Sequence, residues 1–185
     1  MIKRTLKSMA FASALFCGLS QAASTLTLDP PGGAISGTPG ATVGWGFTLT
    51  NTMDYLVISS ASFTPTTALG TFADFSAFNF FVVGPAPDST SVSQAFDAPS
   101  QRGIGSFSID AAALVGTVAS GQIAVTYDLY SVSPNDPLFD PDTDGLSFGN
   151  TLAVNASVSV VPEPEIALLL AAGLIVLYGA HRRRG

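Results

Sequence analysis

The chain has 185 residues, of which 47% are hydrophobic and 11% are charged, and its formal net charge is −6 at pH 7. Six of its seven basic residues lie at the two ends, so Arg102 is the one cation between residues 23 and 161. The same interval holds eleven Asp and no Lys, His, Cys or Glu. Nucleic-acid binding needs clustered Lys and Arg, and many enzymes need an imidazole or a thiol. The composition therefore excludes nucleic acid as a partner, and we expect a protein that is not an enzyme.

The first 22 residues have the pattern of a secretory signal peptide. A basic start is followed by an apolar run over residues 9–19 and by small residues that end at Ala22. That order is read by signal peptidase, so we predict cleavage after Ala22 and export of the remainder. Cys17 follows Phe16, where lipoprotein acylation requires a small residue, and we interpret it as an ordinary part of the apolar run. The exported chain then has no cysteine, which excludes a disulfide framework.

Residues 23–161 have the pattern of one all-β domain. Turn-forming Gly, Pro and Asn clusters recur about every ten residues, a spacing typical of short strands joined by tight turns. From Thr42 to Thr50, apolar residues alternate with Thr and Gly, which predicts a strand with one buried and one solvent-exposed face. On this basis Trp45 is buried between sheets. We expect eight or nine antiparallel strands in a β-sandwich of Ig-like or jelly-roll-like character.

One segment of this domain resembles a known family of extracellular domains. From Pro39 to Asn51, a Pro-Gly turn leads through alternating apolar and Thr positions to an Asn. This is similar to the second strand of bacterial Ig-like extracellular domains. The resemblance implies a sandwich fold and carries no statement about function.

The C-terminal residues 162–185 combine a proline motif, an apolar segment and a basic tail. Pro162, Glu163 and Pro164 precede fifteen uncharged residues, 166–180, and the chain then ends with Arg182, Arg183 and Arg184 before Gly185. As a helix the apolar segment is about 22 Å long, just enough to span a hydrocarbon core of about 30 Å when flanking residues adjust. The arginines mark the cytoplasmic side, so we predict one transmembrane helix with the Asp-rich domain outside.

This arrangement over Val161 to Gly185 resembles the PEP-CTERM sorting signal of Gram-negative bacteria. The resemblance implies recognition by an exosortase in the inner membrane and cleavage near Pro162, Glu163 and Pro164. It also implies release from a transient single-pass state to the cell surface, the outer membrane or an extracellular matrix that contains exopolysaccharide. The alternative is an ordinary single-span anchor without processing.

An acidic loop is the candidate metal site. Asp140, Asp142 and Asp144 alternate before Gly145, a spacing found in the first half of calcium-binding loops. The twelfth position is Thr151 instead of the usual Glu, so any calcium would be held weakly. The alternative interpretation is a solvated acidic turn, because Asp and Gly favour turns for their own reasons.

An aromatic-rich segment, residues 72–81, is a second candidate binding region. Its five Phe side chains would form either a platform for stacking sugars or part of the core. The sequence thus predicts an exported structural or interaction protein processed by an exosortase. The alternative is a calcium-dependent glycan-binding module that is anchored by one transmembrane helix.

Overall fold

A computed structural model describes residues 24–163 together with residues 169, 170 and 172. The predicted signal peptide over residues 1–22, Pro164, Arg182, Arg183, Arg184 and most of the predicted span over residues 166–180 lie outside the described residues. In the part that the structure describes, no helix has both the length and the apolar character needed to cross a membrane.

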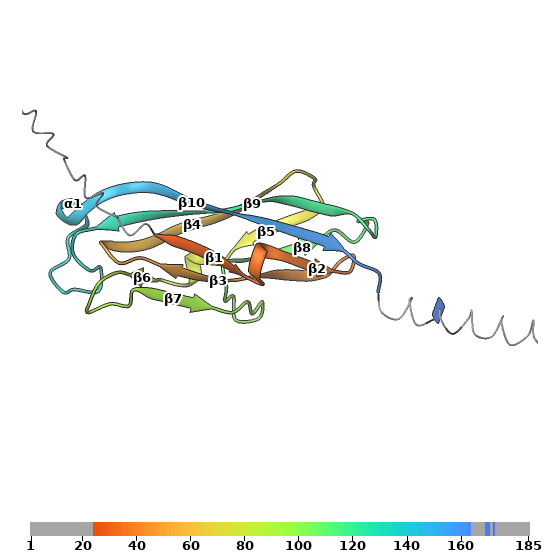
Figure 1. The fold of residues 1–185 in the computed structure, drawn as a ribbon, viewed down its shortest axis with the longest axis horizontal. Helices are drawn as coiled ribbons and strands as arrows, with labels where there is room; N and C mark the ends of the chain where they lie inside the picture. Colours follow the sequence, from red (N-terminus) through yellow and green to blue (C-terminus); the bar gives the residue numbers. More distant parts are fainter. Residues whose placement is uncertain (1–23, 164–168, 171, 173–185) are drawn as a thin grey trace, which may run out of the picture.

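The described chain forms two five-stranded β-sheets packed face to face (Figure 1). The first sheet has the order β1-β3-β8-β5, with β7 also paired to β3, and the second has the order β2-β10-β9-β4-β6. The strands are β1 (Thr25–Asp29), β2 (Ala34–Gly37), β3 (Thr42–Thr50), β4 (Tyr55–Pro65), β5 (Gly70–Asp74), β6 (Val82–Val83), β7 (Ser91–Gln94), β8 (Gly105–Ile109), β9 (Val118–Tyr130) and β10 (Gly145–Val160). Short helical turns are η1 (Pro31–Gly33), η2 (Ser76–Phe78) and α1 (Pro141–Asp144). The predicted all-β sandwich is confirmed, with ten strands where eight or nine were expected.

One pairing departs from the predicted antiparallel arrangement. β2 lies parallel to β10, with Ala34 opposite Ser157 and Gly37 opposite Val160. The sequence predicts the Pro-Gly cluster before β2 as a short turn between two strands. It forms η1, and this turn passes the chain from β1 in the first sheet to β2 in the second. The expectation of a wholly antiparallel sandwich is therefore wrong at this edge.

Trp45 lies at the centre of the core, as the alternation in β3 predicts. Its side chain is 0% exposed, and its ring centroid lies 5.2 Å from that of Phe63 and 6.3 Å from that of Phe72. Its indole Nε1 donates a hydrogen bond of 2.8 Å to the carbonyl of Gly33 in η1. A buried indole N–H needs such a partner, since leaving it unpaired would cost free energy. Trp45 therefore ties both sheets to the turn that connects them.

The other face of β3 is covered in its middle, although its Thr and Gly residues predict a face that is solvent-exposed throughout. Gly44 and Gly46 are buried, because the segment from Gln94 to Phe96 crosses over them. A Cβ atom at Gly46 would lie 2.7 Å from the carbonyl oxygen of Gln94, and one at Gly44 would collide with the ring of Phe96. Glycine at these positions permits close approach of a second layer of chain, which the alternation alone does not reveal.

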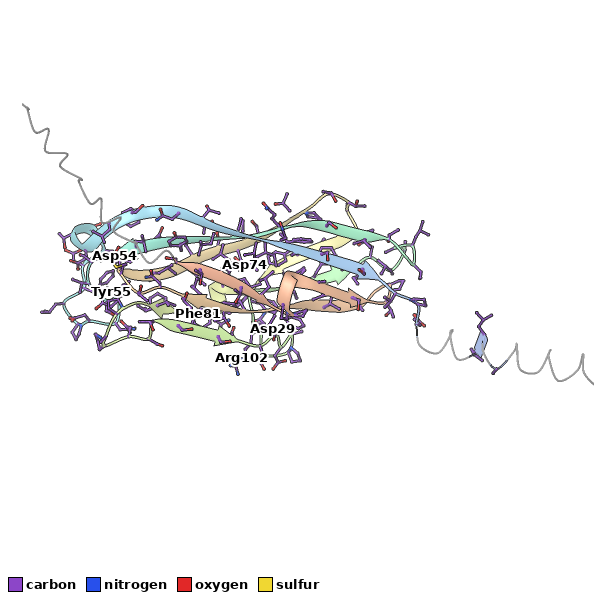
Figure 2. The ribbon with its side chains drawn as sticks, in the orientation of Figure 1. Asp29, Asp54, Tyr55, Asp74, Phe81 and Arg102 are labelled. Carbon is purple, nitrogen blue, oxygen red and sulfur yellow. The ribbon has the colours of Figure 1, made fainter. Side chains whose placement is uncertain are left out.

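The sandwich is elongated and has two chemically different ends (Figure 1). At one end α1 leads into β10, and Asp54 and Tyr55 lie near it (Figure 2). We call this end the acidic pole. β10 then runs along the molecule to the opposite end, where the chain leaves the fold at Val161 (Figure 1). We call that end the exit pole.

Truncation of the central side chain tests this core. Trp45→Ala should lower the free energy of unfolding by about 3–5 kcal/mol, because it leaves a large cavity between the sheets. Trp45→Phe keeps most of the ring but leaves the Gly33 carbonyl without its donor, so the loss should be smaller, about 1–3 kcal/mol. Urea unfolding followed by circular dichroism measures both. Equal stability of all three proteins would contradict the central role of Trp45.

Candidate functional site

The predicted acidic loop forms a short capped helix. Asp140 is the N-cap residue of α1, and its Oδ1 accepts a hydrogen bond of 3.1 Å from the backbone N of Asp142. Asp144 Oδ2 accepts a bond of 2.9 Å from the backbone N of Asp140. Asp at the N-cap followed by Pro141 at the first helical position is a strong local start signal, since Pro lacks the N–H that would be left unpaired there. The loop is thus closed by its own backbone.

This arrangement differs from the predicted convergence of Asp140, Asp142 and Asp144 on a calcium ion. Among the described residues, no group of three or more His, Cys, Asp or Glu side chains is placed to hold a metal ion. Asp140 and Asp144 direct their carboxylates to backbone N–H groups, a local bonding pattern that competes with any other use of Asp oxygens. These hydrogen bonds engage one oxygen of each carboxylate and account for Asp140 and Asp144 without a bound ion.

Gly145 also has a different role from the one expected. Its φ is −67°, which any residue can adopt, so no special backbone conformation requires glycine. The space beside it is filled instead. A Cβ atom at Gly145 would collide with the Phe148 ring and would lie 3.2 Å from the Pro141 carbonyl oxygen. Glycine here lets the aromatic ring of Phe148 lie directly over the start of β10.

Asp88 fastens the rest of the loop to the sandwich. Its Oδ1 accepts a hydrogen bond of 2.7 Å from Asn135 Nδ2, and its Oδ2 accepts a hydrogen bond from the Ser133 hydroxyl. Ser133 is only 4% exposed. Two bonds to one carboxylate from residues two positions apart hold residues 133–135 in place against the turn before β7. The acidic pole therefore presents a fixed surface.

Three aromatic rings, of which Phe148 is exposed and Tyr130 and Phe139 are half-buried, form a group on that surface. The centroid of Tyr130 lies 5.1 Å from that of Phe139 and 5.9 Å from that of Phe148, both in edge-to-face geometry. Phe148 is 62% exposed, Leu138 next to Phe139 is 88% exposed, and Leu146 two residues before Phe148 is 54% exposed. We call these five residues the aromatic patch. Register shifts in β10 between Gly145 and Asn150 accompany this exposure, as bulges do where a strand re-aims its side chains.

Tyr130 keeps its proton throughout the physiological range. Partial burial raises the pKa of its phenol above the ordinary value of 10.0, and the nearby Asp128 carboxylate raises it further. Asp128 is itself held in place, because its Oδ1 accepts a hydrogen bond of 2.8 Å from the backbone N of Gly149. The patch therefore offers a neutral hydroxyl among apolar rings and carboxylates, a combination suited to contacts with polar ligands that have apolar faces.

The aromatic segment over residues 72–81 is divided between core and surface. Phe75 is 5% exposed, while Phe72 and Phe81 are partly buried and pack against the core. Phe78 and Phe80 are 61% and 66% exposed. The segment is thus neither a continuous platform nor wholly internal. Sequence analysis did not identify the aromatic patch, although the alternation of Leu146 and Phe148 at the start of β10 was the available indication.

A cleft on another part of the described molecule has a different character. It opens between β1, η1 and β10, has a volume of about 600 Å³, and is lined by Leu26, Thr27, Leu28, Pro31, Gly32, Gly33, Val154 and Asn155. None of these side chains can act as an acid or a base near neutral pH. The Asp and aromatic side chains of the acidic pole therefore lie outside this cleft.

Comparison with known proteins finds little similarity to this chain. No family model matches it, and no curated protein is significantly similar to it. Two solved structures align with 75% of the chain. One is from the crystal structure of a CaDoc0917 variant in complex with CaCohA2 at pH 5.5, with 22% identity, 100% of that chain covered and a TM-score of 0.29. The other is CaCohA2 from Clostridium acetobutylicum, with 23% identity, 90% of that chain covered and a TM-score of 0.29. Similarity this low leaves fold and function to be argued from the chain itself.

The capped loop gives a prediction that separates the two interpretations of its carboxylates. Asp140→Ala should lower the free energy of unfolding by about 0.5–2 kcal/mol through loss of the helix cap. Calcium at about 10 mM, above the affinity range of extracellular calcium modules, should leave this difference unchanged. Thermal unfolding with and without calcium measures it, with Asp142→Ala as the matched variant that loses a carboxylate but no cap. A melting temperature that rises with calcium, and no longer rises in Asp142→Ala, would show that the loop rearranges around the ion.

Proposed function

We propose that this protein is an exported interaction or structural module, sorted by its C-terminal segment to the cell surface or extracellular matrix. An exosortase cleaves it near Pro162, Glu163 and Pro164 after signal peptidase has removed the first 22 residues. Before cleavage, the segment over residues 166–180 anchors it in the inner membrane, with Arg182, Arg183 and Arg184 on the cytoplasmic side. The folded sandwich is the part that is delivered.

The observation that carries this proposal is the position of the expected cleavage segment. The backbone N of Val161 donates a hydrogen bond of 2.9 Å to the carbonyl of Gly37, which is the last contact of β10 with its neighbour β2. Pro162 and Glu163 follow without regular structure and are exposed. A protease needs an accessible, unpaired stretch of backbone, and folded strands do not offer one. Cleavage after Val161 would leave every strand of the sandwich intact.

The negative net charge of the domain is compatible with an extracellular location. One Arg stands against eleven Asp between residues 23 and 161, so the delivered domain is strongly anionic. A large net charge of one sign keeps such a domain soluble and limits non-specific association. Its partners in a matrix would then be recognised by specific contacts of neutral or apolar groups.

Processing gives a direct test. The mature protein recovered from the outer surface of its native host should lack the first 22 residues and everything beyond about Pro164. Mass spectrometry of the intact protein determines both ends at once. Replacing Pro162, Glu163 and Pro164 with Ala should leave the protein in the inner membrane at its full C-terminal length. An Arg-bearing C-terminus on surface material would show a simple membrane anchor instead.

A second candidate function, glycan binding, is favoured by the aromatic patch. Aromatic rings at the surface stack against the apolar faces of sugars. A neighbouring hydroxyl can donate a hydrogen bond to a sugar hydroxyl or accept one from it, and a carboxylate can accept one. Tyr130, Phe139 and Phe148 supply such rings beside Asp128 and Asp144. This candidate is compatible with sorting to a polysaccharide matrix, since it would supply the attachment there.

The patch predicts a specific loss of binding. Phe148→Ala should weaken binding to exopolysaccharide from the native host about tenfold, equivalent to about 1.4 kcal/mol. Phe78→Ala is the matched control, because it removes an equally exposed Phe from outside the patch. Affinity electrophoresis with and without EDTA measures binding and tests whether it depends on calcium. Equal mobility of wild-type protein in gels with and without the polysaccharide would rule out this second function.

A further inference from the structure

The exit pole carries apolar side chains that the fold does not use. Leu114 is 73% exposed, Val115 is 53% exposed and Val118 is 49% exposed. Val161, where the chain leaves the sandwich, is 37% exposed. We call these four residues the exit patch. Leu114 and Val115 lie between β8 and β9, Val118 begins β9, and Val161 directly follows β10. The start of β9 and the end of β10 lie at the same end of the molecule (Figure 1).

The exit patch is held in a fixed shape next to the departing chain. Gly116 N donates a bond of 2.8 Å to the carbonyl of Val160, and Val160 N donates one of 2.9 Å to the carbonyl of Thr117. The Thr117 backbone N and hydroxyl both donate to the Leu114 carbonyl, which closes the turn. Gly116 takes a φ of +88°, a conformation that glycine adopts without strain. The exposed Leu and Val are therefore presented by a rigid turn.

The two poles differ sharply in charge. The turns that share the exit pole, at residues 38–41, 65–69 and 110–118, and the departing residues 161–163 contain only two charged residues, Asp110 and Glu163. Seven of the eleven Asp between residues 23 and 161 lie in α1, in the loop before it or in the segments beside these two: Asp54, Asp88, Asp128, Asp136, Asp140, Asp142 and Asp144. An anionic bilayer surface therefore repels the acidic pole more strongly than the exit pole.

The connection to the predicted span is too short to hold the domain away from a membrane. Val161 is the last residue bonded to the sandwich, and the apolar segment begins at residue 166. Five residues reach at most about 17 Å when fully extended. The segment itself, at about 22 Å as a helix, is shorter than the hydrocarbon core of about 30 Å, so it draws the connection into the interface. The exit pole is then the end that meets the lipid.

We infer that the exit patch rests in the headgroup region of the lipid bilayer while the chain is anchored. Leu114 and Val115 enter the boundary between headgroups and acyl chains, and the acidic pole points away from the membrane. This inference rests on the anchoring step of the proposed function. It adds an orientation that holds Pro162 and Glu163 at the membrane surface, where a membrane-embedded protease would act.

Single cysteine probes test this orientation in the full chain. The sequence has one cysteine, Cys17. In a Cys17→Ser chain, a single introduced cysteine is therefore the one position that takes the label. Leu114→Cys at the exit patch and Leu138→Cys at the acidic pole are matched, because both replace highly exposed leucines. Each labelled protein is reconstituted into phosphatidylcholine and phosphatidylglycerol vesicles that contain nitroxide lipids. Emission from the Leu114→Cys label should be quenched several-fold more than emission from the Leu138→Cys label.

The outcomes distinguish this inference from the function on which it rests. Vesicle flotation that leaves the protein behind would overturn the anchoring step and the inference together. Flotation with equal quenching at both positions would overturn the inference alone. Emission from the Leu114→Cys label that changes with protein density, and not with nitroxide lipid, would assign the patch to a second copy of the chain and also overturn it. Adding Val115→Asp to the Leu114→Cys chain should reduce the quenching without changing the melting temperature, because the substituted side chain is exposed.

Discussion

The fold depends on one buried hydrogen-bonded aromatic residue. Trp45 fills the space between the two sheets and donates its indole N–H to Gly33, in the turn where the chain passes from one sheet to the other. The packing of the core and the hydrogen bond of a buried N–H group thus both depend on Trp45. Because a buried indole needs both a shaped cavity and an acceptor, the position of η1 is fixed by the core. The parallel pairing of β2 with β10 follows from that position.

Because the core between the two sheets stabilises the sandwich, its two ends can differ in residues and charge. The acidic pole combines a capped helix, a carboxylate that fastens a loop and three edge-to-face rings. The exit pole combines a closed turn with exposed Leu and Val and almost no charge. β10 runs between them, so one strand joins the candidate recognition surface to the segment expected to be cleaved. Attachment to a membrane at one end would leave the other end presented outward.

The acidic loop shows how local bonding competes with a motif. Alternating Asp residues followed by Gly have the spacing of a calcium loop, yet Asp140 and Asp144 satisfy backbone donors of their own turn. These bonds engage one oxygen of each carboxylate, so local backbone bonding explains the two Asp residues without a bound ion. Phe148 occupies the space beside Gly145, so that glycine is explained by an aromatic contact that lies outside the motif.

The sequence by itself determined the class of fold, the burial of Trp45 and the concentration of basic residues at the two ends, because alternation, turn residues and charge runs are local properties. It did not reveal the covered face of β3, where Gly44 and Gly46 lie under the segment around Phe96. Nor did it group Tyr130, Phe139 and Phe148, or place the turn after Leu114 against Val160. These arrangements depend on which strands become neighbours, and strand order is a property of the whole chain. Only the tertiary structure decided them, because packing brings together residues whose spacing in the sequence carries no common pattern.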